Sequence, residues 1–339
     1  MGGAPWSSTH AAVHRLLRVR PLLPPGAAVL VAVSGGQDSV CLLKLLVDLQ
    51  PKWGWRLRVV HCDHRWRPDS GANAEFVRGL CDRYQIPCDI AVAEAVTPTE
   101  AAARQWRYQV FEQLATEQHC TQVVTGHTAS DRAETLLYNL LRGSGTDGLQ
   151  ALAWQRPLAP ASPVTVVRPL LELTRQETAD FCRQFELPLW SDATNQDTRY
   201  ARNRIRLELL PYLREHFNPG VESTLAHTAE LLTAEVELLE SLAEDLYGVV
   251  VSGGGEGGEG DGGSWRIRRS SLAAAPLALQ RRVVRRVLQQ VTTAQVSFEQ
   301  VEKLLALLSA PNGSQSDPFP GGAIAVVRGE WVVVGRVGG

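Results

Sequence analysis

The residues best suited to chemistry lie in a short polar loop that follows the apolar residues 29–33. The loop consists of Ser34, Gly35, Gly36, Gln37, Asp38 and Ser39. Its glycines allow backbone N–H groups to point into one concavity, and the helix predicted to follow directs its positive dipole end there. We therefore predict a phosphate-binding corner, although an ordinary turn between a strand and a helix has similar residues. It is not the common P-loop, which needs a lysine beside Ser or Thr after its second glycine.

A second chemical cluster consists of His127, Asp131 and Glu134. Their spacing of four and then three residues places them on one face of a helix, near its amino end. The helix dipole alone would explain any one acidic residue at a helix start, but three such residues on one face indicate a site. The cluster could hold Mg²⁺, a cationic amine, or both.

Two arginines, Arg104 and Arg107, lie three residues apart in a predicted helix over 100–118. They are interpreted either as phosphate clamps or as part of a surface helix in which Glu100 attracts Arg104. Another polar segment, residues 61–67, follows a strand pattern and contains Asp63. The glycine-rich segment 142–148 suits either a helix end or a loop that closes over substrate.

Alternating strand and helix patterns position these residues. Predicted strands cover 29–33, 57–61, 88–93, 122–126 and 165–168. Predicted helices cover 7–20, 40–49, 73–84, 100–118 and 130–142, and another begins at a capping-box pattern over 174–177. This alternation is typical of an α/β fold with a doubly wound parallel sheet, whose ligands bind outside the carboxyl ends of the strands. We therefore expect the loops at Ser34, His61 and Gly126 to meet at one site.

Composition limits the class of protein. A chain of 339 residues with 44% hydrophobic and 21% charged residues is expected to be soluble and to form two or three domains. Its net charge of −2 argues against a surface that binds nucleic acid throughout but permits a local basic face. The six cysteines form no Cys-x-x-Cys pair, which disfavours structural zinc and sulfur transfer and suits a reducing compartment. Without a membrane-length apolar run or a signal peptide pattern, a cytoplasmic location is expected.

Five segments carry a resemblance to a known family. They are SGGQDS at 34–39, HCDHRWR at 61–67, EAAARQWRY at 100–108, GHTASDRAETLLYNLLRGSGTDGL at 126–149 and DATNQDTRYARNRIRLELLP at 192–211. In this order they resemble the tRNA(Ile)-lysidine synthases, a family within the PP-loop ATP pyrophosphatases. The similarity spans residues 24–217 and continues more weakly to the end of the chain.

The resemblance implies an ATP-dependent ligase that converts the wobble cytidine of the isoleucine tRNA with a CAU anticodon into lysidine. ATP would adenylate the cytosine carbonyl oxygen and release pyrophosphate; the amine of free L-lysine would then displace AMP. The Ser34–Ser39 loop and Asp63 would bind ATP, and Asp38 and Asp63 would bind Mg²⁺. The residues that would carry the reaction and recognise lysine are Arg104, Arg107, His127, Asp131 and Glu134.

The chain departs from the family pattern at four positions. Gln37 replaces a proline of the loop, while Thr128, Ser130 and Arg132 replace a histidine, an aspartate and a glutamine of the family helix. Two alternatives therefore stay open. One is another PP-loop tRNA-modifying enzyme, such as a thiolase, which would need a cysteine pair that this chain lacks. The other is a tRNA-binding protein without catalytic activity, which the retained acidic residues disfavour.

Arginine-rich segments supply candidate contacts with tRNA. Residues 199–206 contain four arginines beside Tyr200, which suits an RNA backbone and a splayed base, although a loop with solvated arginines has the same composition. A predicted helix over 277–291 carries arginines opposite a valine face, and we favour a tRNA contact over a solvated face. The candidates are Arg142, Arg199, Arg202, Arg204, Arg281, Arg282 and Arg285.

We expect two domains, a PP-loop catalytic domain over 1–218 and a small α+β domain over 219–339. A long amphipathic helix over about 222–247 suits an interdomain or intersubunit contact, so the chain could form a homodimer. The Gly-rich segment 252–264 predicts a flexible insertion without chemistry. Residues 323–334 predict a hairpin whose Gly-Glu turn suits type II′.

Overall fold

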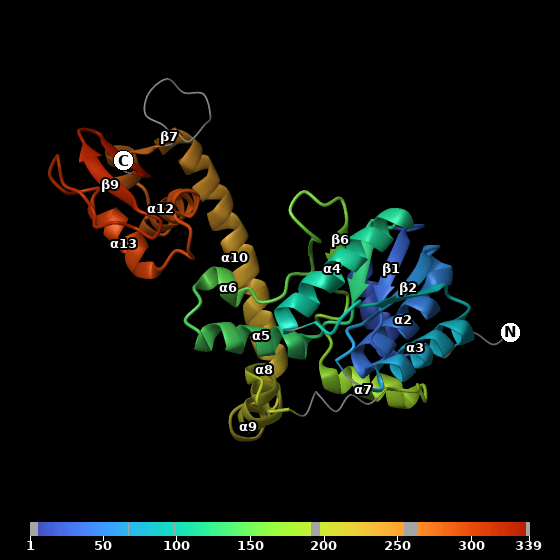
Figure 1. The fold of residues 1–339 in the computed structure, drawn as a ribbon. Coiled ribbons are helices and arrows are strands. Elements are labelled where there is room, and N and C mark those ends of the chain that lie inside the picture. The colour runs from blue at the N-terminus through green and yellow to red at the C-terminus, as the bar shows by residue number, and fades with distance from the viewer. Residues whose placement is uncertain (1–5, 67, 98, 191–196, 254–263, 337–339) are drawn as a thin grey trace. The chain divides into compact units, whose positions relative to one another are not determined.

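The computed structural model describes residues 6–66, 68–97, 99–190, 197–253 and 264–336 (Figure 1). The chain divides into two compact units, Met1–Thr233 and Ala234–Gly339. The division falls within helix α10 (Val221–Val250), whereas the sequence predicted a boundary before this helix. The difference arises because the first turns of α10 pack on the first unit through Val221 and Leu225.

A six-stranded sheet forms the centre of the first unit (Figure 1). Its strands are β1 (Ala28–Ala32), β2 (Arg56–Asp63), β3 (Cys88–Val92), β4 (Gln122–Thr125), β5 (Gln155–Pro157) and β6 (Thr165–Val167). Their order is β3-β2-β1-β4-β6-β5, and each neighbouring pair is parallel except β5 and β6. The predicted doubly wound parallel sheet is confirmed. Strand β5 was not predicted, because three residues are too few to show a periodicity.

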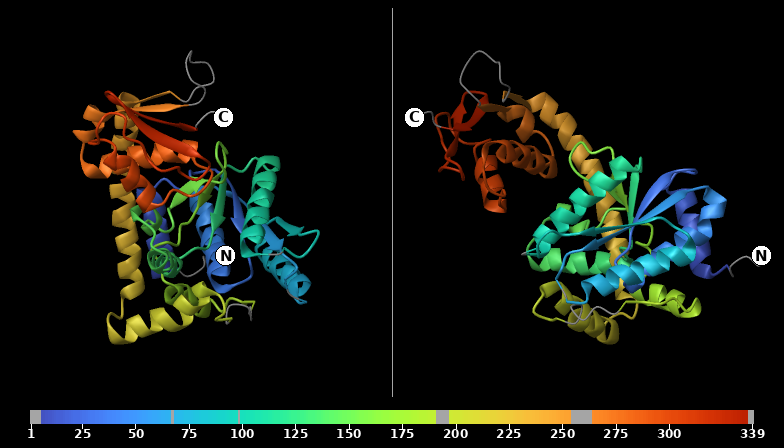
Figure 2. Two further views of the ribbon diagram at one scale, coloured as in Figure 1. Left: turned by 60° about the vertical axis from the view of Figure 1, so that its left-hand side comes forward. Right: turned by 45° about the vertical axis from the view of Figure 1, so that its right-hand side comes forward.

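Helices cover both faces of this sheet (Figures 1 and 2). Side chains alternate along β1, so Val29 and Val31 pack with α1, α2, α3 and α7, whereas Leu30 packs with Phe111 of α4. The helices are α1 (Ser8–Val19), α2 (Gln37–Trp53), α3 (Ser70–Tyr84), α4 (Glu100–Glu117), α5 (Ala129–Leu141), α6 (Thr146–Leu149), α7 (Arg175–Gln184), α8 (Ala201–Arg204) and α9 (Leu210–His216). A π-helical turn, η2 (Ile205–Leu209), joins α8 to α9.

The direction of strand order reverses between β1 and β4, which creates the crevice that doubly wound folds use for ligands. The loop after β2 reaches the loop after β1, because Nδ1 of His61 lies 2.8 Å from the carbonyl oxygen of Val33. Gly126 lies so close to the first turn of α2 that a Cβ there would be 2.9 Å from the carbonyl oxygen of Asp38. The predicted meeting of the three loops is confirmed, and this contact requires glycine at 126.

A separate small core joins α5 to the described part of the fifth motif and to the start of α10. Ala133 of α5, Ile205 of η2, Leu210 of α9 and Val221 of α10 form this buried cluster. Helix α5 is thereby packed between the sheet-bound loops and α8–α9. Arg67 and residues 192–196 of the quoted motifs lie outside the described residues.

The second unit contains a four-stranded antiparallel sheet of order β7-β8-β10-β9. Its elements are β7 (Val251–Gly253), β8 (Trp265–Arg268), α11 (Arg269–Ala273), α12 (Leu277–Val291), α13 (Phe298–Ala306), β9 (Ala323–Arg328) and β10 (Trp331–Arg336). The valine face of α12 packs in the core with the sheet. The predicted hairpin is confirmed, and Gly329 has the positive φ of +59° that the first position of a type II′ turn requires. Most of the predicted insertion, residues 254–263, lies outside the described residues.

The structure also bears on membrane-spanning helices and on the cysteines. No helix in the described ranges combines the length and apolarity that crossing a bilayer requires. All six cysteines are free thiols, and Cys41, Cys81, Cys120 and Cys182 are buried.

Candidate active site

The Ser34–Ser39 loop is shaped as a cradle. Gly35 has a φ of +88°, and a Cβ at this position would lie 2.6 Å from Oδ1 of Asn73, so only glycine fits. The hydroxyl of Ser39 donates to the carbonyl oxygen of Gly36 at 2.8 Å and accepts from the N–H of Ser34 at 3.2 Å. Among described residues, no side chain caps the start of α2. The first N–H groups of α2 are therefore directed toward a site suited to an anion.

Two buried polar atoms beside this cradle support a ligand there. Oδ1 of Asn73 and Nε1 of Trp190 have no hydrogen-bond partner among the described residues. Other atoms of the same residues hold the loop: Nδ2 of Asn73 donates to Ser34 at 3.1 Å, and the N–H of Trp190 donates to Gly35 at 3.0 Å. Because buried polar groups are usually bonded, the two remaining atoms suit contacts with a bound molecule. The sequence analysis missed both residues, since neither belongs to a recognisable motif.

The departure at Gln37 ties the loop to α7. Its Nε2 donates to the carbonyl oxygen of Arg175 at 2.7 Å and to Oγ1 of Thr178 at 2.8 Å. The Thr178 hydroxyl in turn donates to Asp38. A proline at this position could not make these bonds. Gln37 therefore holds the loop through hydrogen bonds with α7, where a proline would make the loop backbone rigid.

Arg175, the first residue of α7, connects three carboxylates that the sequence placed at the site. Its Nε donates to Asp38 at 3.1 Å, its Nη2 to Asp131 at 2.8 Å and its Nη1 to Glu134 at 2.9 Å. Arg206 of η2 adds a bidentate contact with Glu134, at 2.7 and 2.8 Å. We call Asp38, Asp131 and Glu134 the carboxylate cluster. Helical spacing had grouped Asp131 and Glu134 with His127, and Asp38 was predicted in the loop. Neither arginine was predicted as a partner of these acids, although Arg175 lies in the capping box and Arg206 in the arginine-rich segment.

The pKa values of the two aspartates in the carboxylate cluster are shifted in opposite directions. Burial raises the pKa of Asp38, and the neighbouring Asp131 adds to this effect, while Arg175 opposes it. Burial also acts against ionisation of Asp131, but Arg175 and His127 outweigh burial, so the pKa of Asp131 is lowered. The cluster is thus an anionic pocket whose charge is balanced by the guanidinium groups of Arg175 and Arg206, and another cation would have to compete with them.

His127 is an electrostatic neighbour of Asp131, and its Nδ1 lies 2.8 Å from Oγ1 of Thr125. Burial, together with Arg168, Arg107 and Arg104, lowers the pKa of His127 to about 4, although Asp131 opposes the shift. The imidazole is therefore neutral near pH 7. Arg104 and Arg107 of α4, both predicted at the site, are thus electrostatic neighbours of His127.

Four arginines form what we call the arginine cluster, Arg104, Arg107, Arg156 and Arg168. Arg104 and Arg156 lie over the ring of Tyr108, 5.0 and 4.9 Å from its centre. Arg168 is 1% exposed, and burial lowers its pKa to about 10, with Arg156 and Arg104 contributing. Within the part of the chain that the structure describes, none of the four lies within 4.0 Å of a carboxylate oxygen. Arg168 is buried, Arg107 and Arg156 are half-buried, and Arg104 is exposed. A cation without a counter-ion favours binding of an anion, most strongly where it is buried.

Arg156 and Arg168 were missed by the sequence analysis. Arg168 could have been found, because a charged residue at the carboxyl end of a predicted strand lies where ligands bind in this fold. Arg156 belongs to the unpredicted strand β5 and carried no signal.

Asp63 lies at the end of β2, buried, and its Oδ1 accepts the N–H of Arg65 at 2.8 Å. Beside it, His64 packs against Trp66 and Trp106, and burial lowers the pKa of His64 to about 4. The described residues contain no group of three His, Cys, Asp or Glu side chains arranged to hold a metal ion. A magnesium ion at Asp38 or Asp63 would therefore need phosphate oxygens or water as further ligands.

The three departures within α5 all make structural contacts. Thr128 caps the helix, accepting the N–H of Asp131 at 3.3 Å and donating its hydroxyl to that carboxylate at 2.8 Å. Ser130 donates to Glu222 of α10 and accepts the N–H of Arg175 at 2.9 Å. Arg132 forms an ion pair with Glu230, also of α10, at 2.9 Å. These residues hold α5 in place and leave His127, Asp131 and Glu134 directed toward the site.

The candidate tRNA-binding arginines fall into two groups. In the first unit, Arg142 donates to the hydroxyl of Tyr138 at 2.9 Å, and Arg202 lies 5.6 Å from the centre of the same ring. Arg204 lines a groove beside them, whereas Arg199 pairs with Asp197 at 2.7 Å on the surface.

The second group lies on α12 of the second unit. Arg281 pairs with Glu302 at 2.7 Å, and Arg282 pairs with Glu240. Arg285 is half-buried on the same helix. The structure therefore brings Arg142, Arg202 and Arg204 together, while Arg281 and Arg282 of α12 contact acids of their own unit.

Comparison with known proteins gives two family matches. Residues 9–213 match the family model described as a PP-loop domain, and residues 268–330 match the TilS substrate binding domain. Curated relatives named tRNA(Ile)-lysidine synthase include those of Nostoc sp. (53% identical over 97% of each chain) and Thermosynechococcus vestitus (48% identical, covering 98% of this chain and 93% of the relative). A chloroplastic relative from Zygnema circumcarinatum is 35% identical over 89% of this chain and 80% of its own.

Among solved structures, the U34-tRNA thiolase NcsA from Methanococcus maripaludis superimposes with a TM-score of 0.55. It is 17% identical in sequence and covers 66% of this chain and 78% of its own. At this identity the likeness concerns the fold alone.

Proposed function

The chain belongs to the tRNA(Ile)-lysidine synthase family, and we propose how its residues divide the work of forming lysidine. Its PP-loop domain uses ATP, and the enzyme is a ligase that forms lysidine on an isoleucine tRNA. The identity of the substrates, the metal ion and the role of each residue are proposed from the contacts within the first unit.

We assign the reaction to the wobble cytidine of a tRNA with a CAU anticodon. The carbonyl oxygen of the cytosine attacks the α-phosphate of ATP, and pyrophosphate leaves with the electron pair of the broken P–O bond. The amine of free L-lysine then attacks the activated ring carbon, loses a proton, and AMP departs. Each step needs charge stabilisation at a different place, on the phosphates first and on the amine second.

The phosphate step is assigned to the Ser34–Ser39 loop and the arginine cluster. Backbone N–H groups at the start of α2 would hold the departing pyrophosphate. Arg104, Arg107 and Arg168 would offset the charge that develops at the α-phosphate. The support for this assignment is that these three arginines, of which Arg168 is buried, lack carboxylate partners among the described side chains.

The amine step is assigned to Asp131 and Glu134 of the carboxylate cluster. Asp131 and Glu134 would bind the ammonium group of lysine in place of the Arg175 guanidinium, which occupies the pocket here. Neutral His127 or one of the carboxylates would take the proton. This proposal rests chiefly on one observation: three acids beside the phosphate cradle converge on a single cation.

Magnesium is proposed to act at the phosphate side. Asp38 and Asp63 would hold it together with ATP oxygens, since Mg²⁺ is commonly bound by one or two carboxylates plus substrate phosphates. Asp38 can do so only if Arg175 withdraws from it. Entry of lysine and of the metal would therefore both require movement of the same side chain.

A homodimer remains part of the proposal. Leu238 and Leu242, four residues apart on α10, are exposed, which suits contact with a second copy. Sedimentation equilibrium tests it: a dimer mass that falls on Leu238→Glu supports the contact, and a monomer at all concentrations contradicts it.

One assay tests the proposed reaction. The protein is incubated with ATP, Mg²⁺, radiolabelled lysine and tRNA(Ile) transcripts that differ only in the anticodon. We expect lysine incorporation into the CAU transcript and none into a GAU transcript. Absence of lysine from the CAU transcript would overturn the assignment, and incorporation of sulfur instead would favour the thiolase alternative.

A further inference from the structure

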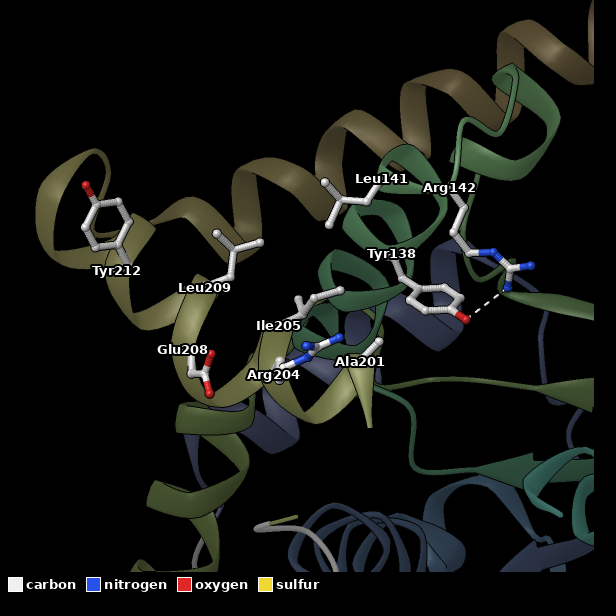
Figure 3. A pocket seen from close by; sticks show the side chains of 9 residues that line it. All are labelled: Tyr138, Leu141, Arg142, Ala201, Arg204, Ile205, Glu208, Leu209 and Tyr212. Carbon is white, nitrogen blue, oxygen red and sulfur yellow. Dashed lines mark hydrogen bonds between the residues drawn. The ribbon is translucent and has the colours of Figure 1, made fainter. Parts of the chain in front are cut away.

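The first unit has an open groove between the end of α5 and the segment α8–η2–α9 (Figure 3). Its volume is about 580 Å³. Tyr138, Leu141 and Arg142 of α5 line one side, and Arg204, Glu208 and Tyr212 belong to the other segment. None of these residues has been given a part in the reaction described above.

The groove combines aromatic rings, aliphatic side chains and arginines, which is the chemistry that binds an unstacked base. Leu141 is 70% exposed and Tyr212 54% exposed, so apolar surface faces solvent. Arg142 and Arg202 both lie over the Tyr138 ring, at 5.2 and 5.6 Å from its centre. Bases of single-stranded RNA stack on aromatic rings and on guanidinium planes of this kind.

The charges of the groove fit a nucleotide better than an apolar peptide. Among the described residues, Arg142, Arg202 and Arg204 have no carboxylate oxygen within 4.0 Å. They are therefore available to a phosphate of the RNA backbone. Glu208, also in the lining, repels phosphate but can accept a hydrogen bond from an exocyclic amino group.

The groove lies directly beside the carboxylate cluster. Asp131, Glu134 and Tyr138 follow one another on α5 at spacings of three and four residues, which places them on one face of the helix. Tyr138 lies about 6 Å along the helix axis beyond Glu134, from a rise of 1.5 Å per residue. On the other side, Arg206 binds Glu134 while its neighbour Arg204 lines the groove.

We propose that this groove binds the base of a nucleotide directly flanking the wobble cytidine. The inference rests on the proposed function, because it takes the cytidine to react beside Glu134. One nucleotide step of an extended strand spans the distance from that position to Tyr138. Stacking of the flanking base on Tyr138, with its phosphate on the arginines, would hold the cytidine unstacked from its neighbour and facing ATP.

The test pairs protein variants with altered transcripts. Tyr138→Ala removes the ring and Tyr138→Phe keeps it, while abasic transcripts lack the base on the 5′ or the 3′ side of the wobble cytidine. Thermal unfolding checks that both variants fold. We expect Tyr138→Ala to lower kcat/KM for intact tRNA roughly 5- to 100-fold, the range typical of one lost stacking contact, and Tyr138→Phe to retain most of the activity.

If the Tyr138 ring stacks on a flanking base, loss of the ring and loss of that base should have the same effect. On the abasic transcript that lacks this base, Tyr138→Ala should therefore cause no further loss of kcat/KM. Equal losses on all transcripts, or an effect on the KM for ATP in place of tRNA, would overturn the proposal.

A second readout is independent of lysidine formation. The transcript carries 2-aminopurine at the flanking position whose base is coupled to Tyr138. Its fluorescence should be quenched on binding to the unmodified protein and to Tyr138→Phe, but not on binding to Tyr138→Ala. Equal quenching with all three proteins would contradict binding of the flanking base in this groove, whether or not lysine is incorporated.

Discussion

Arginines gather both in the active site and on α12, but the two groups have opposite surroundings in the structure. Arg104, Arg107 and Arg168 lie around Tyr108 or His127 with no carboxylate oxygen within 4.0 Å among described residues. Arg281 and Arg282 instead pair with glutamates of their own unit. An arginine without an acidic partner can bind an anion without breaking an ion pair. A paired arginine already stabilises the fold and would have to leave its partner. Whether a carboxylate lies nearby is therefore a better guide to phosphate binding than the number of arginines in a segment.

The strongest test of this contrast is Arg168→Met. Loss of one buried cation that faces a reacting phosphate should lower kcat for lysidine formation by about 100-fold or more, as removal of a preorganised charge-stabilising group does elsewhere. The melting temperature should stay equal or rise, because an unpaired buried charge is replaced by an apolar side chain of similar length. Steady-state kinetics and calorimetry measure both. A destabilised variant with normal kcat would show that Arg168 is structural.

A variant of the carboxylate cluster, Arg175→Gln, should affect stability more than Arg168→Met does. It leaves Asp131 without its main cation, and we expect a loss of about 1–3 kcal/mol, below the usual cost of breaking a buried pair because the guanidinium is partly exposed. Millimolar lysine should raise the melting temperature of this variant more than that of the unmodified protein, since lysine no longer competes with Arg175. If lysine leaves both melting temperatures unchanged, the pocket does not bind the amine.

The histidine between the two clusters provides a pH test. His127 has a pKa of about 4 in the folded protein and an ordinary value in the unfolded chain, so the unfolded state binds more protons between about pH 4 and 6.5. Stability should therefore fall as the pH is lowered through this window, and His127→Gln should reduce that dependence. NMR titration of the ring measures the pKa directly. ATP should raise it, because the phosphates offset the surrounding arginines; an unchanged value would contradict this placement.

The smallest effect is expected for Arg282→Gln on α12. The variant loses an ion pair with Glu240, which is 43% exposed, so we expect a loss of no more than about 1 kcal/mol. Binding of tRNA should weaken only a few-fold, and the weakening should disappear at high salt. Arg281→Gln is the matched control on the same helix. A loss of tRNA binding as large as that of an active-site variant would make α12 a principal RNA contact and would reverse the contrast.

Local patterns predicted much of the fold and part of the site. The spacing of His127, Asp131 and Glu134 was sufficient to group them, because an α-helix fixes which residues share a face. The meeting of the loops at Ser34 and Gly126 followed from strand alternation alone. Each of these inferences depends on residues close together in sequence.

The partners of these residues could not be predicted in the same way. Arg175 reaches Glu134 across 41 residues, and Arg206 reaches it across 72; such pairings depend on how α7 and η2 pack, which no periodicity encodes. The same limit applies to Arg282, whose partner Glu240 lies 42 residues away. The departures at Ser130 and Arg132 were likewise intelligible only once α10 was seen beside them.

The central claim is that phosphate chemistry and amine recognition are carried by separate clusters, and Asp131→Asn tests it most directly. Pyrophosphate release and lysine incorporation are measured in the same reaction with ATP, Mg²⁺, lysine and tRNA. We predict that Asp131→Asn retains tRNA-dependent release of pyrophosphate but loses lysine incorporation by a factor of about 1,000, whereas Arg168→Met loses both. Loss of pyrophosphate release in Asp131→Asn, with normal tRNA binding, would contradict the division between the clusters.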